Sequence, residues 1–148
     1  MKTDDNTFSV EKPEESSGFL LWQVTNLWQR EIKKVLEQHG ITHSQYVLMA
    51  SIHWLTLHDL EVTQIVLSGH TKIDPMTTSM VLRTLQKKGF VQRHEHLTDT
   101  RAKIVELTES GIQTVKDAVI TVEKFDTDFF SRLENEISTF NRNLIKLL

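Results

Sequence analysis

The stretch DPMTTSMVLRTLQKKG, residues 74–89, decides the fold of this 148-residue chain. It predicts a helix that begins at Asp74 and Pro75, because an aspartate cap followed by proline in the first turn favours a helix start. One side should be buried, since helical spacing groups Thr78, Val81, Leu82 and Leu85. The opposite side carries Met76, Thr77, Met80, Arg83 and Lys87, with Ser79 and Thr84 on its flanks. A basic last turn and Gly89 predict the end of the helix.

Two short runs of β-type residues follow this helix, at 90–96 and 102–107, on either side of the turn LTDTR at 97–101. A helix followed by a two-stranded wing is the arrangement of a winged helix-turn-helix, which points to DNA. The local charge agrees, because residues 70–103 hold 7 Lys or Arg against 3 Asp or Glu in a chain of net charge -3. Phosphate affinity depends on this local field rather than on the charge of the whole chain.

The length and the remaining pattern predict one domain, mainly α-helical with a small β-wing. Residues 1–16 are polar and acidic, which indicates a mobile arm. Helices are expected over 17–39, from Thr42, from Thr63 to Ser68 and Gly69, over 75–88, and after Thr108, the last stretch being broken near Asp126–Asp128. Within the single domain 17–148, residues 42–108 form the expected winged-helix part, and residues 17–40 and 109–148 form the expected dimerisation helices.

The C-terminal segment carries an apolar seam at intervals of four and three residues: Phe129, Leu133, Ile137, Phe140, Leu144 and Leu147. The helix over 17–39 has too many apolar residues for a single stripe, so it needs cover on more than one side. Packing against a second subunit explains both features, and packing inside one subunit is the alternative.

These residues resemble the MarR-type winged-helix transcriptional regulators over about residues 17–146. The resemblance rests on residues 74–91, on the string Asp99-x-Arg101-x3-Val105-x-Leu107-Thr108-x2-Gly111, and on residues 41–46. It implies a homodimer, a palindromic operator, and a ligand pocket between the dimerisation and DNA-binding parts. Two features depart from the family pattern: the turn at 69–73 is about two residues longer, and Met80 replaces a polar or basic residue.

The predicted DNA contacts lie on the helix over 75–88 and on the wing. For the major groove we expect base or phosphate contacts from Thr77, Ser79 and Arg83, and contact between Met80 and a thymine methyl group. For the minor groove we expect Arg101, with Asp99 holding the turn or orienting an arginine. Candidates for phosphate-backbone contacts are Lys72, Lys87, Lys88, Arg93 and Lys103. Ordinary solvated surface is the alternative for each of these side chains.

A small aromatic or amphipathic effector is a further possible partner. Four side chains fall where the resemblance implies its pocket, Trp22, Trp28, His53 and Trp54, and the same residues suit a helical core or a dimer interface. The seven histidines (39, 43, 53, 58, 70, 94 and 96) raise a metal-responsive alternative. Their spacing brings no recognisable zinc pattern, and the absence of cysteine excludes thiolate ligands.

No catalytic constellation stands out, so neither an enzyme nor a cofactor is expected. No apolar run approaches ~18 residues and no signal-peptide pattern is present, which predicts a soluble cytoplasmic protein without a membrane partner. The sequence therefore predicts a homodimeric, DNA-binding transcriptional regulator, more consistent with a repressor, that a small molecule releases from its operator. The alternatives are a winged-helix module that docks on protein without reading DNA, and a metal-responsive member of the same family.

Overall fold

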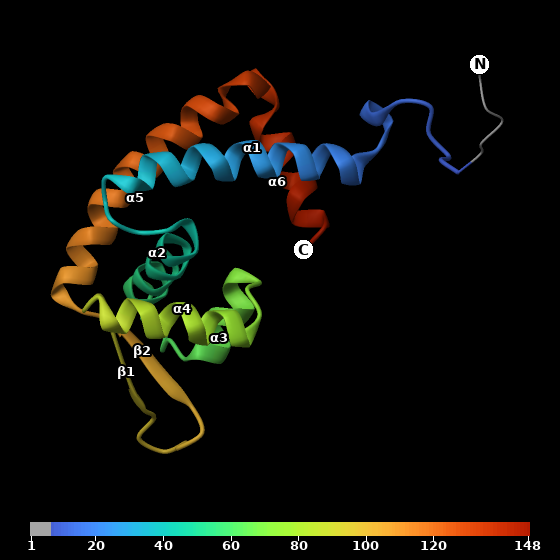
Figure 1. Cartoon of the computed structure of the whole chain (residues 1–148). Coiled ribbons are helices and arrows are strands. Elements are labelled where there is room, and N and C mark those ends of the chain that lie inside the picture. The colour runs from blue at the N-terminus through green and yellow to red at the C-terminus, as the bar shows by residue number, and fades with distance from the viewer. Residues whose placement is uncertain (1–6) are drawn as a thin grey trace.

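Helices make up most of residues 7–148, the part of the chain that the computed structural model describes (Figure 1). In chain order the elements are the 3-10 helix η1 (Pro13–Glu15), α1 (Ser17–Glu37), α2 (His43–Leu57), α3 (Gln64–Thr71), α4 (Pro75–Lys87), β1 (Val91–Glu95), β2 (Lys103–Leu107), α5 (Glu109–Phe130), the 3-10 helix η2 (Ser131–Glu136) and α6 (Ile137–Lys146). None of the helices within residues 7–148 combines the length and the apolar character needed to cross a bilayer.

The winged-helix part consists of α2, α3 and α4 with the antiparallel pair β1–β2, which projects away from the helices (Figure 1). The strand register pairs Val91 with Leu107 at the base of the wing and Glu95 with Lys103 towards its tip. The wing is also joined to the loop before α3, because the Val105 N–H donates to the Val62 carbonyl at 2.8 Å. Strand β2 is thus hydrogen-bonded both to β1 and to the loop before α3.

The predicted orientation of the helix over 75–88 is confirmed in α4. Thr78, Leu82 and Leu85 are fully buried and Val81 is partly buried. They pack in one core with α2, α3, the wing and α5, which includes Leu48, Ile52, Leu67, Val91, Val105 and Val115. The capping predictions at Thr42, Thr63, Asp74 and Thr108 are confirmed as well, since each side chain accepts a backbone N–H of the following helix.

The first turn of α5 packs directly on the start of the wing. The Thr108 hydroxyl donates to the Gly89 carbonyl at 2.6 Å and accepts the Gly111 N–H at 3.1 Å. A Cβ atom added to Gly111 would lie 2.1 Å from the Phe90 carbonyl oxygen, so only glycine allows this approach. The Leu-Thr-x-x-Gly string therefore has a packing reason.

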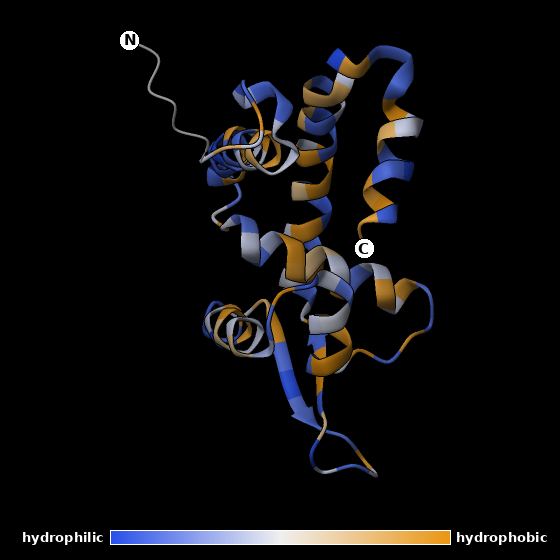
Figure 2. Ribbon diagram, turned by 90° about the vertical axis from the view of Figure 1, so that its right-hand side faces the viewer, coloured by the Kyte–Doolittle hydropathy of each residue, from blue (hydrophilic) through white to orange (hydrophobic). Residues whose placement is uncertain are grey.

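The helices α1 and α6 lie on opposite sides of α5, as Figures 1 and 2 show together. Only the C-terminal half of α1 contributes buried residues, Ile32 and Leu36, whereas α6 contributes none. Large apolar side chains are exposed along both helices and at the residue after α6: Phe19, Leu20, Leu21, Trp22, Val24, Leu27, Ile137, Leu144, Ile145 and Leu147. A single copy of the chain leaves these two faces uncovered.

Two predicted boundaries are wrong. Helix α3 does not end at Ser68 and Gly69 but continues to Thr71, and Lys72 ends it in the left-handed conformation with φ 64°. The extra residues before α4 therefore lengthen a helix rather than the turn, and the Ser68 hydroxyl closes that turn by donating to the Ile73 carbonyl.

The break in the C-terminal segment also lies later than predicted. Helix α5 runs unbroken through Asp126–Asp128, and the chain bends in η2, where Glu134 has φ 53°. One aromatic pair at i, i+4 spacing spans the expected break and favours a continuous helix there, Phe125 and Phe129, with ring centroids 5.8 Å apart. Of the predicted mobile arm, residues 1–6 lie outside the described residues, whereas Glu11–Glu15 form a small hydrogen-bonded turn at η1.

Candidate nucleic-acid interface

The polar side of α4 is exposed over its whole length. Met76 is 75% exposed and Met80 58% exposed, and Arg83 and Lys87 are exposed on the same side. Ser79 is partly buried at the flank, and the Thr84 hydroxyl donates back to the Met80 carbonyl. The exposed face therefore offers one guanidinium, one ammonium and two thioethers along three turns of helix.

At the start of α4, Asp74 and Thr77 form a closed pair. The Asp74 carboxylate accepts the Thr77 N–H at 2.9 Å and the Thr77 hydroxyl at 2.7 Å. The backbone hydrogen bond, and after it the side-chain hydrogen bond, lowers the pKa of Asp74. The Thr77 hydroxyl already donates its proton to Asp74, so it can accept a hydrogen bond from a base but cannot donate one to a phosphate while this pair is intact.

The wing turn is held by Asp99 and His96. The Asp99 carboxylate accepts the Arg101 N–H at 3.1 Å, which leaves the Arg101 side chain exposed at the tip. His96 Nδ1 accepts the N–H groups of Thr98 and Asp99 at 3.1 Å, so its proton is on Nε2, which donates to Glu61 at 2.7 Å. Asp99 holds the turn, one of the two roles expected of it.

The contact between Glu61 and His96 was not predicted from the sequence, which indicated His96 only as a possible metal ligand. Together they tie the wing to the loop before α3 through a contact spanning 35 residues. A contact of that sequence separation has no local pattern that could have predicted it.

The five predicted backbone-contact cations fall into two groups. Lys72 and Lys87 are exposed, and Lys103 lies 3.9 Å from Glu95 across the wing, also exposed. By contrast, Arg93 donates to Gln86 of α4 at 3.1 Å and to Gln64 of α3 at 3.0 Å, and so braces the wing against both helices.

Lys88 is exposed as well, but its side chain is held at the loop before α2. Its ammonium donates to the Gly40 carbonyl at 2.8 Å and to Gln45 at 3.0 Å, at the junction between α1 and α2.

The four candidate effector-pocket residues are not brought to one place by their contacts. Trp22 is 67% exposed and lines a shallow surface hollow with Phe19, Gln23, Asn26, Leu27 and Arg30. Trp28 donates to Asp126 at 2.8 Å and meets His43 edge-on at 4.9 Å. Trp54 stacks on His58 at 3.9 Å and on His70 at 5.8 Å, and His53 is partly buried on α2.

Around Trp28, the pKa values of two titratable groups of α2 are shifted by their surroundings: His43, which the sequence analysis named only as a possible metal ligand, and Tyr46, which it did not name as a site residue. Burial lowers the pKa of His43, with Asp126 opposing it. Burial, aided by the charges of Glu123 and Asp126, raises the pKa of Tyr46 to about 12. The junction of α1, α2 and α5 therefore combines aromatic rings, a carboxylate and a histidine disfavoured in its charged form.

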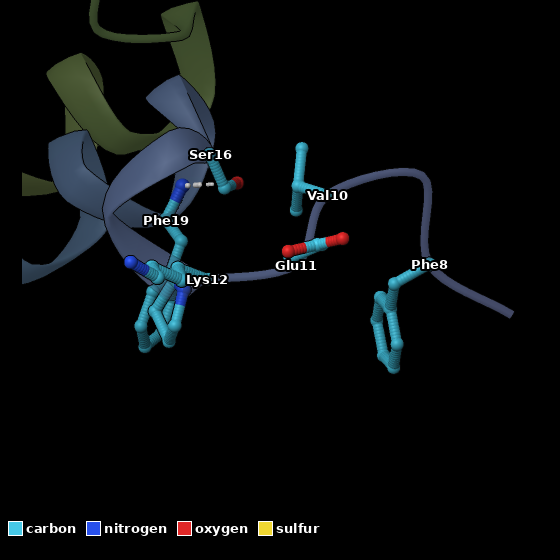
Figure 3. Close-up of a pocket in the computed structure, with 7 residues that line it drawn as sticks. Phe8, Val10, Glu11, Lys12, Ser16 and Phe19 are labelled. Carbon is cyan, nitrogen blue, oxygen red and sulfur yellow. Dashed lines mark hydrogen bonds between the residues drawn. The ribbon is translucent and has the colours of Figure 1, made fainter. Parts of the chain in front are cut away.

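A separate hollow of about 420 Å³ lies where the N-terminal arm meets α1. Figure 3 shows Phe8 on the arm at one end, Phe19 with Lys12 beside it at the other, and Glu11 between the two ends. It is open and apolar, and it continues the exposed apolar side of α1. Across residues 7–148, no three histidine or acidic side chains gather as a bound metal ion would require.

Comparison with known proteins places this geometry in a family. The family profile described as "ArnR1-like, winged-helix domain" matches residues 37–126. The chain is 42% identical over 119 residues to YdcH, an HTH-type transcriptional regulator of Bacillus subtilis, which covers 80% of this chain and 81% of YdcH.

Two solved structures have the same fold. The S. aureus MepR–DNA complex superposes with a TM-score of 0.81 at 25% identity, covering 89% of this chain and 95% of MepR. A mutant of E. coli MarR in complex with operator DNA gives a TM-score of 0.75 at 24% identity, covering 88% and 92%. The chain therefore belongs to the MarR-type winged-helix regulators, which are DNA-binding transcription factors and not enzymes.

Proposed function

We propose that this regulator is a homodimeric repressor that binds a palindromic operator with α4 in the major groove and the wing along the minor groove. The observation that carries the proposal is the exposed side of α4, with Arg83 and Lys87, next to a wing whose tip presents Arg101. A major groove ~12 Å wide admits one α-helix, and arginine favours a narrow minor groove. MepR and MarR, both of this fold, are known in complex with DNA.

Each predicted contact has a defined part in this proposal. Arg83 binds a guanine through O6 and N7, Met80 contacts a thymine methyl group, and Thr77 accepts from a base or lies against a phosphate. Ser79 is assigned to the edge of the interface because it is partly buried. Lys72, Lys87 and Lys103 contact phosphates, whereas Arg93, held by Gln64 and Gln86, contributes mainly by fixing the wing.

The homodimer is supported by the two apolar faces that a single chain leaves open. Helices α1 and α6 lie on opposite sides of α5 (Figure 2), and large apolar residues are exposed on the N-terminal half of α1 and along α6. Monomeric proteins seldom expose contiguous apolar patches of this kind. A two-fold pairing through these helices would hold two copies of α4 at successive turns of the DNA, ~34 Å apart.

Release by a small effector is supported by the groups around Trp28, where α1, α2 and α5 meet. Aromatic surface with His43, Tyr46 and Asp126 suits an amphipathic molecule that carries a ring and one polar group. A regulator that binds chromosomal DNA would be located in the cytoplasm.

The test is selection of bound sites from random duplex DNA, followed by titration of the selected site and of a scrambled duplex over a salt series. We expect a two-fold symmetric site and an affinity that falls steeply with salt, because phosphate contacts release counterions. Absence of enrichment, together with a salt-independent affinity, would instead favour the protein-docking alternative.

A further inference from the structure

Lys87 and Lys88, adjacent at the end of α4, are both exposed, but the ammonium of Lys88 is held by hydrogen bonds to another part of the chain. Lys87 is the last residue of the helix and lies on its exposed side. Lys88 caps the helix, and its ammonium reaches 48 residues back in the sequence to the Gly40 carbonyl at 2.8 Å. The same ammonium donates to Gln45 Oε1 at 3.0 Å. From the sequence, Lys87 was placed on the exposed side of the helix, and both lysines were candidates for phosphate contacts.

The acceptors of Lys88 are themselves fixed. Gln45 is only 6% exposed, and its Oε1 also accepts the Thr42 N–H at 3.1 Å, while Thr42 accepts the Gln45 N–H at 3.2 Å. Gly40 has φ 69°, a left-handed conformation that glycine adopts without strain. The ammonium thus binds a preformed pair of oxygens, and hydrogen bonds from a charged donor are stronger than neutral ones.

This junction is in turn attached to α5. His43, the first residue of α2, meets the Trp28 ring of α1, and Trp28 donates to Asp126 of α5. His39 Nε2 lies 2.7 Å from the Thr121 hydroxyl, also on α5. The segment 39–45 therefore contacts the C-terminal end of α4 through Gly40 and Gln45, and it contacts α1 and α5 through His43 and His39.

We propose that Lys88 is a positioning residue: by binding Gly40 and Gln45 it sets the orientation of α4 relative to α1 and α5, and it makes no DNA contact. The proposal rests on the proposed function, in which those two helices belong to the body that spaces the two copies of α4. A reading helix that tilts on this body no longer fits both half-sites, because their separation is set by the DNA. Lys88 then determines specificity, whereas Lys87 supplies affinity that is independent of sequence.

The experiment compares Lys88→Met with Lys87→Met in the full-length chain; methionine keeps an unbranched apolar stem and removes the charge. Each is titrated against the selected operator and a scrambled duplex over a salt series. For Lys87→Met we expect the magnitude of the log–log salt slope to fall by about 1, with the preference for the operator unchanged. For Lys88→Met we expect an unchanged slope and an operator preference reduced about fivefold.

Two further variants test the mechanism. Lys88→Arg keeps donors that can reach both oxygens and should restore most of the preference. Combining Lys88→Met with Gln45→Met should cost no more preference than the larger single change, because both remove the same contact. A slope reduced by about 1 in Lys88→Met with full preference would make Lys88 a phosphate contact and overturn the proposal, as would a variant indistinguishable from the parent.

A measurement without DNA separates this proposal from the proposed function. Hydrogen–deuterium exchange should be faster in Lys88→Met than in Lys87→Met at the last turn of α4 and at residues 40–45, since those amides lose their shared anchor. If exchange is faster in Lys88→Met but the parent protein prefers no DNA sequence, the proposed function is refuted and the anchoring contact is supported. If exchange in Lys88→Met equals that in Lys87→Met and the parent does prefer an operator, only the positioning role of Lys88 is refuted.

Discussion

At the scale of single residues, Arg101 has the clearest expected effect on binding. Arg101→Ala should weaken operator binding by about 1–3 kcal/mol, because it removes a guanidinium from the minor groove. The fold and the dimer should be unaffected, since only the backbone N–H of Arg101 takes part in the turn, which Asp99 holds. If mobility-shift titrations gave the same operator affinity for parent and variant, the wing tip would not be part of the DNA interface.

His43 should make stability depend on pH in a defined direction. Its pKa is lowered in the folded state by burial, so the unfolded chain binds this proton more readily. Stability from this source is complete above the unfolded value of 6.5 and is lost as the pH falls through the lowered folded pKa. Urea titrations of parent and His43→Gln between pH 7.5 and 5 should converge as the pH falls, whereas exposed His94→Gln should follow the parent; a constant difference would contradict this.

Residue-level prediction succeeded where the determinant was local. The Asp74 cap and the buried positions of α4 follow from spacing and cap chemistry within a few residues. Prediction failed where the partner was remote: Lys88 was named as a candidate for a phosphate contact, although its ammonium binds Gly40 and Gln45.

At the scale of elements, two glycines offer opposite tests of the same substitution. Gly111→Ala should destabilise the chain by about 1–3 kcal/mol, because the new methyl group would overlap the Phe90 carbonyl and force α5 off the wing. Gly69→Ala should stabilise it by about 0.5–1 kcal/mol, since Gly69 lies inside α3 with free space around it. Urea denaturation measures both, and a stabilised Gly111→Ala variant would show that the contact is not as close.

The position of Gly69 also explains one wrong prediction. Glycine commonly ends a helix, so Ser68 and Gly69 looked like the end of α3. The buried Leu67 and the bond from the Thr71 hydroxyl to the Leu67 carbonyl keep the helix intact for another turn. Tertiary packing outweighed a local preference of about 1 kcal/mol.

At the scale of the whole molecule, the dimer proposal predicts opposite behaviour for two positions on α6. Leu144→Glu should yield a folded monomer, because Leu144 lies on the apolar seam and is already partly exposed in a single copy. Ser138→Glu adds the same charge on the other side of α6, where the residue is exposed, and should remain dimeric. Light scattering with circular dichroism distinguishes the two; a parent that is a well-folded monomer would refute the dimer.

The winged-helix arrangement was largely predictable because each of its elements carries its own start, stop and apolar period. The course of the C-terminal segment was less so, since the bend at Glu134 has no glycine or proline to mark it. The placement of α1 and α6 on opposite sides of α5 depends on packing between distant segments, which the period of each helix does not specify.

We propose that the exposed side of α4 reads bases, and the replacement of Arg83, the guanidinium on that side, provides the sharpest test. The measurement is selection of bound sites from random DNA, carried out in parallel for the parent and for Arg83→Ala. If Arg83 binds guanine through O6 and N7, the variant should lose the preference for guanine at one symmetric pair of positions and keep the rest of the site. An identical selected site with undiminished affinity would contradict the claim that α4 enters the major groove by this side.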